Sequence, residues 1–260
     1  MSTVTQRISE IKQPRGGYIK PSQFTARAFN DGNALAEEEN IHASIVGMTV
    51  DYMTRYLMGT DIEEAFAVSV CGAIMESHLT SSTKMGESAV EFLEGIRGTD
   101  DASIINACKM TTFDVWYRNP MAAMLAKGAE DTNPDADTIR NIRIMIQRSL
   151  DFWKTYGPIT KDGFTFEENG YTATVDSGDG DFLTKDTLWD FKVSKAKPTS
   201  KHTLQLLMYW IMGQHSEKPE FRGINKLGIF NPRLNTVYTL EMSKVPADII
   251  RAVENDVICY

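Results

Sequence analysis

The chain has 260 residues, 42% of them hydrophobic and 24% charged, which excludes a mainly disordered, collagen-like or coiled-coil protein. Its formal net charge of −8 argues against a protein that coats nucleic acid non-specifically, but not against an enzyme with a local basic groove. No stretch is apolar enough for a membrane helix or a signal peptide, and the three cysteines lack any CxxC spacing. We therefore expect a reduced, cytoplasmic protein with no membrane partner.

Residues 1–33 differ from the rest of the chain in charge. They carry five basic side chains against two acidic ones, and their prolines and glycines disfavour regular structure. We predict a basic irregular arm here, which either touches phosphate or is an ordinary solvated terminal tail.

Residues 34–158 are predicted to be mainly helical. Apolar side chains recur at spacings of three and four between Ile41 and Tyr56, as one buried face of a helix requires. Asp137 is placed to cap a long helix that continues to Trp153. Further helices are expected over 63–77, 87–96 and 104–125, the last broken near Asn119-Pro120.

Residues 159–260 change to a strand-rich pattern. Asn169-Gly170 separates two short apolar segments, the strongest two-residue hairpin signal. We predict this hairpin over 163–176, a second one over 182–193, a helix over 200–214, strands over 226–230 and 236–241, and a closing helix over 246–256. Together, residues 34–260 are expected to form one α/β domain, with a small mixed sheet and a helical N-terminal part.

The second hairpin brings acidic side chains together. A two-residue turn at Lys185-Asp186 would pair Asp181 directly with Asp190, and strand alternation would place Lys192 on the same face. Opposed carboxylates repel unless a cation lies between them, and oxygen ligands favour Mg²⁺ or Mn²⁺. A solvated face with an exposed Asp–Lys pair is the alternative interpretation.

These residues belong to a longer ordered pattern. Gly178-x-x-Asp181, Asp190-Phe-Lys192 and Gln205-x-x-x-Tyr209 together resemble the PD-(D/E)XK nuclease superfamily, in its RecB-like, lambda-type exonuclease branch. The resemblance covers about residues 160–241. It implies a restriction-endonuclease-like core and a metal-dependent DNA nuclease, with roles in DNA repair or recombination or in a phage.

The resemblance also implies a role for each residue of the pattern. Asp181 and Asp190 would be metal-binding carboxylates, Phe191 would lend its backbone carbonyl to the metal, and Lys192 would be the catalytic lysine. Gln205 and Tyr209 would shape the site and contact DNA.

Nucleases of this branch also take a ligand from an N-terminal helix. Their Gly-x-x-Val-His pattern has its counterpart here in Gly47-Met-Thr-Val50-Asp51, which makes Asp51 the expected ligand. Asp51 would lie about 80° from the centre of the apolar helix face. His42 is the rival, but it would project about 180° away from Asp51, and a surface or helix-start histidine is its other interpretation.

Basic residues follow the pattern in the chain. Lys195, Lys197, Lys201 and His202 are candidates for binding the DNA backbone, with a solvated loop as the alternative. The sequence thus favours a DNA-cleaving enzyme, with DNA as its partner and a homo-oligomer or a protein partner as further expectations. The alternative is a nuclease-fold protein from a phage or mobile element that binds DNA or protein without cleaving.

Overall fold

The computed structural model describes residues 2–80 and 84–260. The chain forms two compact units. The sheet unit consists of Met1–Asn30 and Phe152–Tyr260, and the helical unit consists of Asp31–Asp151. The predicted change from helices to strands near residue 158 lies close to the second boundary. None of the described helices is long and apolar enough to cross a membrane.

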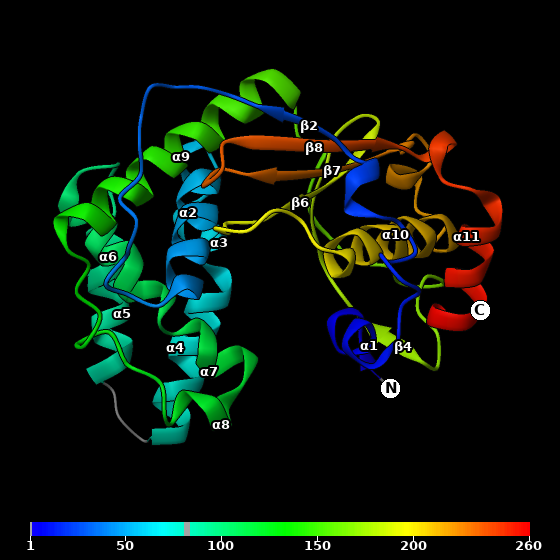
Figure 1. The fold of residues 1–260 in the computed structure, drawn as a ribbon. Helices are drawn as coiled ribbons and strands as arrows, with labels where there is room; N and C mark the ends of the chain where they lie inside the picture. Colours follow the sequence, from blue (N-terminus) through cyan, green and yellow to red (C-terminus); the bar gives the residue numbers. More distant parts are fainter. Residues whose placement is uncertain (1, 81–83) are drawn as a thin grey trace. The chain divides into compact units, whose positions relative to one another are not determined.

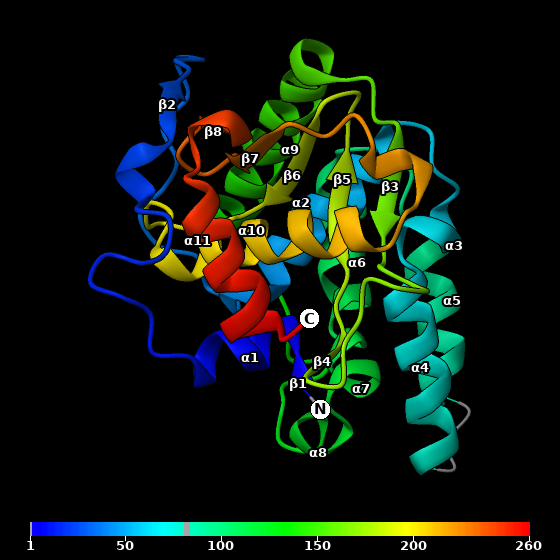
Figure 2. The ribbon, with the colours of Figure 1, turned by 90° about the vertical axis from the view of Figure 1, so that its right-hand side faces the viewer.

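The sheet unit contains a mixed six-stranded sheet of order β2-β8-β7-β6-β5-β3 among the described residues (Figure 2). Strands β6 and β7 are parallel, and the other neighbours are antiparallel. This confirms a mixed α/β fold with a small sheet. The strands are β2 (Thr25–Ala28), β3 (Lys161–Phe164), β5 (Gly180–Leu183), β6 (Thr187–Phe191), β7 (Lys226–Asn231) and β8 (Thr236–Glu241).

Helix α10 (Ser200–His215) covers one face of the sheet and connects β6 to β7 (Figure 1). Its buried leucines and methionines pack with Leu183, Leu188 and Leu227 in one apolar core. The opposite face carries an aromatic cluster, in which Phe152 stacks on Phe230 with ring centroids 4.2 Å apart. Each such side chain contributes about 1.5–3 kcal/mol when fully buried, so both faces of the sheet are apolar and fixed by packing.

The predicted hairpin at Asn169-Gly170 is wrong. Strand β3 pairs with β5, and β4 (Val175–Ser177) pairs in parallel with β1 (Ser2–Thr3). Gly170 is required for a different reason, since a Cβ there would lie 2.5 Å from the Phe166 carbonyl oxygen. The Asn-Gly signal thus marks a close backbone approach rather than a strand turn.

The prediction of an irregular arm over residues 1–33 is also wrong, because this stretch holds β1, a helix, a 3₁₀ turn at Pro21–Gln23 and a strand. Residues Val4–Glu10 form helix α1, and β2 pairs with β8. The physical reason is tertiary: Val4 and Ile8 are buried in the core of the sheet unit, and Arg7 donates to the Val257 carbonyl at 2.8 Å.

The C-terminal helix of the sheet unit lies where the sequence predicts it. Helix α11 (Ala247–Ala252) continues into a π-helical segment, Val253–Ile258, which agrees with the predicted helix over 246–256. Val253, Val257 and Ile258 are buried in the same core as α10.

The helical unit confirms the prediction that this part of the chain is mainly helical. The predicted break near Asn119-Pro120 is confirmed, because Asn119 caps α8 and accepts from the Ala122 amide at 3.1 Å. The predicted helix over 104–125 has another break, between α6 and α7. The prediction that Asp137 caps the long helix is wrong, because Asp135 accepts from the Thr138 amide at 2.8 Å and Asp137 lies in the first turn. The helices are α2 (Ala43–Leu57), α3 (Ile62–Ala65), α4 (Ala67–Thr80), α5 (Lys84–Glu94), α6 (Asp101–Thr111), α7 (Asp114–Arg118), α8 (Pro120–Ala123) and α9 (Ala136–Tyr156), which runs on into the sheet unit.

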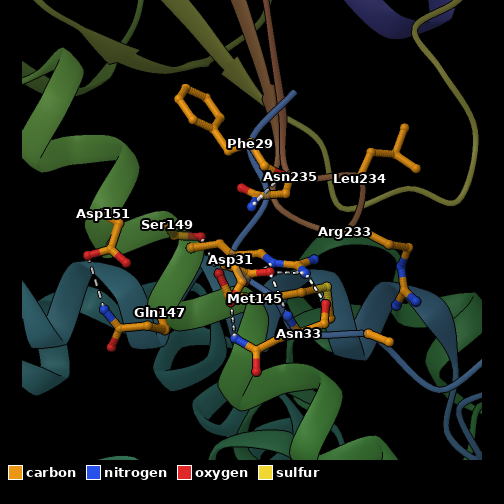
Figure 3. A network of polar contacts seen from close by, with 12 residues as sticks. Phe29, Asp31, Asn33, Met145, Gln147, Ser149, Asp151, Arg233, Leu234 and Asn235 are labelled. Atoms are coloured by element: carbon orange, nitrogen blue, oxygen red, sulfur yellow. Dashed lines mark hydrogen bonds and ion pairs between the residues drawn. The ribbon is translucent and has the colours of Figure 1, made fainter. Parts of the chain in front are cut away.

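An ion pair ties the first residues of the helical unit to α9. The guanidinium of Arg148 donates to both carboxylate oxygens of Asp31 at 2.7 and 3.0 Å and to the Asn33 carbonyl at 2.7 Å. Figure 3 shows Asp31 and Asn33 within this network. The hydrogen bonds from Arg148 hold the pKa of Asp31 well below its usual range, so the folded state favours the charged carboxylate.

Replacing Asp31 with asparagine should therefore lower the free energy of unfolding by about 2 kcal/mol at pH 7. Because the folded pKa is depressed, this contribution exists above the unfolded pKa of about 3.9 and is lost as pH falls below it. Urea unfolding of both proteins at pH 7 and in acid measures the difference. Asp131→Asn, at an exposed position, is the control, and a difference that persists unchanged in acid would contradict the prediction.

Candidate active site

The hairpin of β5 and β6 has the predicted register. Phe182 pairs with Trp189 and Leu183 with Leu188, and the Thr184 amide donates to the Thr187 carbonyl at 3.0 Å across the turn. Lys185 and Asp186 thus form the two-residue turn that the sequence indicated. Asp181 precedes the first of these pairs and Asp190 follows it, so both lie at the open end of the hairpin.

Strand alternation along β6 is also as predicted. Leu188 packs in the core formed with α10, whereas Trp189 belongs to the aromatic cluster on the opposite face. Asp190 and Lys192 share a face, since the Lys192 ammonium contacts Asp190 Oδ1 at 2.9 Å. Only 4% of the Asp190 side chain is exposed, against 30% of the Lys192 side chain. The alternative interpretation, an exposed Asp–Lys pair on a solvated face, therefore does not describe Asp190.

The two carboxylates are held by partners within the hairpin. Asp181 Oδ2 accepts a hydrogen bond from the Phe191 amide at 2.7 Å, and Lys192 is the counter-ion of Asp190. Burial would lower the pKa of Lys192, but the charges of Asp190 and Asp181 outweigh it and raise that pKa. Lys192 is therefore positively charged at neutral pH and offsets the carboxylate repulsion.

One carboxylate oxygen of this site suits a metal ion. Asp190 Oδ2 is buried, and the structure gives it no hydrogen-bond partner among the described residues, although a buried anionic oxygen normally has one. No group of three or more His, Cys, Asp or Glu side chains in residues 2–80 and 84–260 is arranged as a metal site. The carboxylate oxygens of Asp181 and Asp190 are of the chemical type that Mg²⁺ and Mn²⁺ prefer.

Gln205 and Tyr209 interact as their four-residue spacing on α10 requires. The Gln205 amide donates to the Tyr209 hydroxyl at 2.9 Å. Tyr209 is buried, and its pKa is raised first by that burial and then by the negative charges of Asp190, Asp181 and Asp179. The structure thus brings Tyr209 into the electrostatic field of the two carboxylates.

The glycine of the pattern has a steric role beside this tyrosine. A Cβ at Gly178 would lie 2.7 Å from Val4 Cγ2 and 3.7 Å from Tyr209 Cε1. Glycine therefore lets the segment before β5 approach α1 and α10 closely.

His202 has a structural role that its place among the lysines did not reveal. Its Nδ1 accepts from the Thr199 amide at 3.2 Å in a capping box at the start of α10. Burial, together with the positive charge of Lys192, lowers its pKa. His202 is therefore neutral at pH 7 and lies within the field of Lys192; the Thr199-x-x-His202 spacing is the signal that would have identified the cap.

The three predicted DNA-binding lysines are exposed. Lys195 and Lys197 lie on the connection between β6 and α10, and Lys201 lies in the first turn of α10. Phosphate binding by these side chains stays a prediction.

The two candidate N-terminal ligands belong to the helical unit. His42 is exposed and caps α2, where its Nδ1 accepts from the Ser44 amide at 3.3 Å, so the helix-start interpretation is confirmed for it. Asp51 is half-buried and pairs with Arg55 at 3.0 Å. Its role as a metal ligand stays a prediction.

The chain was compared with protein-family models, with curated proteins and with solved structures, and none of these comparisons finds a match.

Proposed function

We propose that the sheet unit carries the active site of a metal-dependent DNA nuclease, an exonuclease of the PD-(D/E)XK type. The observation that carries the proposal is the charged Lys192 held against the buried Asp190, whose second oxygen lacks a partner among the described residues. Asp181 lies across the same hairpin end. Most buried carboxylate oxygens have a partner, and the ion pair with Lys192 supplies one for Asp190 Oδ1 only.

The surrounding topology supports a restriction-endonuclease-like core for this site. An antiparallel hairpin carries the acidic residues, and α10 then connects β6 to the parallel strand β7. This connection returns across one face of the sheet, where Tyr209 lies in the field of Asp190 and Asp181 and accepts a hydrogen bond from Gln205.

The protein's own groups have distinct tasks in phosphodiester hydrolysis. Lys192 provides a fixed positive charge for the negative charge that develops on the phosphate. Asp190 holds that ammonium in place, and the Phe191 amide fixes the orientation of Asp181. A divalent ion held by Asp181, Asp190 and the Phe191 carbonyl would supply Lewis-acid stabilisation of the phosphate.

Gln205 and Tyr209 should affect substrate positioning more than the reaction itself. Gln205→Ala and Tyr209→Phe should each lower cleavage by about tenfold and leave measurable activity, because they remove one hydrogen bond at the edge of the site. Steady-state cleavage of labelled DNA measures both variants. Gln214→Ala, at an exposed position on the same helix, is the matched control, and a complete loss of activity in Gln205→Ala would contradict a positioning role.

The decisive experiment incubates the protein with labelled linear, circular and single-stranded DNA in Mg²⁺, Mn²⁺ or EDTA. We expect cleavage that needs a divalent ion and a free DNA end, and no cleavage by Asp190→Asn. Cleavage of closed circles would instead indicate an endonuclease. If none of the substrates is cut with either metal, the proposal fails and a binding protein becomes the better interpretation.

A further inference from the structure

The helical unit contains a cavity that the proposed nuclease site does not use. Its volume is about 330 Å³, and its lining comes from α4, the α6–α7 junction, α7, α8 and the loop after α8. Glu76, Phe113, Trp116 and Lys127 are among the lining residues. Cavities of this size are typical of small-molecule sites.

Glu76 is the unusual member of this lining. The residue is only 8% exposed, and its Oε2 has no hydrogen-bond partner within the part of the chain that the structure describes. Burial raises the pKa of Glu76. A buried carboxyl without a partner destabilises a fold, so a carboxyl that none of the described side chains pairs with, at the wall of a cavity, points to a bound ligand as its partner.

The chemistry of the lining defines that partner. An ionised carboxylate only accepts hydrogen bonds and favours a positively charged donor. Phe113 and Trp116 add aromatic rings, which attract cations through their faces and also bury apolar surface. We propose that this cavity binds a small organic cation, an ammonium or amidinium group on an apolar body, with Glu76 as the residue that accepts its N–H donors.

Lys127 is the internal rival of such a ligand, because it lines the same cavity and carries the same charge. If Lys127 were the natural partner of Glu76, removing Lys127 would destabilise the fold, and the cavity would need no ligand. If the cavity serves a ligand, Lys127→Met should instead leave stability unchanged and tighten cation binding, since a competing positive charge is gone.

The test uses benzylammonium and benzamidinium as probes, with benzyl alcohol as the neutral control, in calorimetric titration at pH 7. We expect at least one cation to bind with a dissociation constant of about 1 mM or below, ordinary for so small a ligand, and benzyl alcohol to bind at least about tenfold more weakly. Glu76→Gln should lose at least about tenfold in cation affinity, whereas the exposed Glu91→Gln on α5 should bind like the wild type.

A second measurement separates binding from folding. Glu76→Gln should unfold at a higher temperature than the wild type without ligand, because the amide removes an uncompensated buried charge. A lower unfolding temperature would assign Glu76 to the structure and overturn the proposal. Equal affinity of Glu76→Gln and wild type, equal binding of benzyl alcohol, or no binding of either cation would overturn it too. DNA cleavage is independent of all these outcomes.

Discussion

Lys192→Ala should lower DNA cleavage by about 10²–10³-fold, the usual effect of removing one preorganised group that stabilises transition-state charge. Lys192 is suited to this role because it is charged at neutral pH and held 2.9 Å from a buried carboxylate. Its position is therefore fixed before substrate arrives. Single-turnover cleavage of labelled DNA measures the loss. Lys244→Ala is the control, because Lys244 is exposed and distant from Lys192 in the sequence.

The same substitution should also reveal the second role of Lys192. Without the ammonium, Asp190 remains buried with no counter-ion, which should cost about 3 kcal/mol of unfolding free energy in EDTA. Mg²⁺ should restore part of this loss by mass action, without restoring cleavage. Lys192→Ala that cuts DNA like the wild type would contradict the proposed role, because the lysine would then be only a structural counter-ion.

The hairpin with the acidic residues could be predicted because its determinants are local. A two-residue turn and strict strand alternation are enough to pair Phe182 with Trp189 and to place Asp190 and Lys192 on one face. Gln205 and Tyr209 were likewise predictable, since four residues on a helix bring two side chains together.

The N-terminal segment and the Asn169-Gly170 turn were not predictable in this way. Thr3 and Gln6 form a capping box at the start of α1, so the Thr3-x-x-Gln6 spacing is a local signal of this helix. The burial of Val4 and Ile8 in the sheet unit depends on residues far along the chain and has no local signal. Gly170 fits where two backbones meet, close to the carbonyls of Phe166 and Met212. A turn-like dipeptide looks the same in both situations.

The sequence predicts that the two carboxylates repel each other, and only the structure shows which groups offset this repulsion. The sequence placed Asp181 and Asp190 opposite each other, but it could not show that the Phe191 amide takes one carboxylate and Lys192 the other. One oxygen of each carboxylate thus has a partner within the chain, whereas Asp190 Oδ2 has none among the described residues. A bound ion would act on a preformed arrangement rather than assemble it.

Asp190→Asn should abolish both DNA cleavage and the rise in thermal midpoint that Mg²⁺ gives the wild type. The wild-type rise follows from preferential binding of the ion to the folded state and should grow with ion concentration. At one hundred times the dissociation constant, the ion should add about 2.7 kcal/mol to the free energy of unfolding. Asparagine keeps the shape of the side chain but removes the anionic oxygen that lacks a partner among the described residues. Thermal unfolding in Mg²⁺ and in EDTA measures the effect.

Asp186→Asn on the turn of the same hairpin is the matched control. Asp186 also pairs with a lysine, Lys226, at 2.7 Å, but it lies in the turn, at the opposite end of the hairpin from the site. This variant should keep the full Mg²⁺-dependent rise and its cleavage activity, although losing its own ion pair lowers its midpoint in EDTA. If Asp190→Asn keeps the rise while Asp186→Asn loses it, the ion binds at the turn, and the pairing of Asp190 with Lys192 is then a structural contact with no part in metal-dependent cleavage.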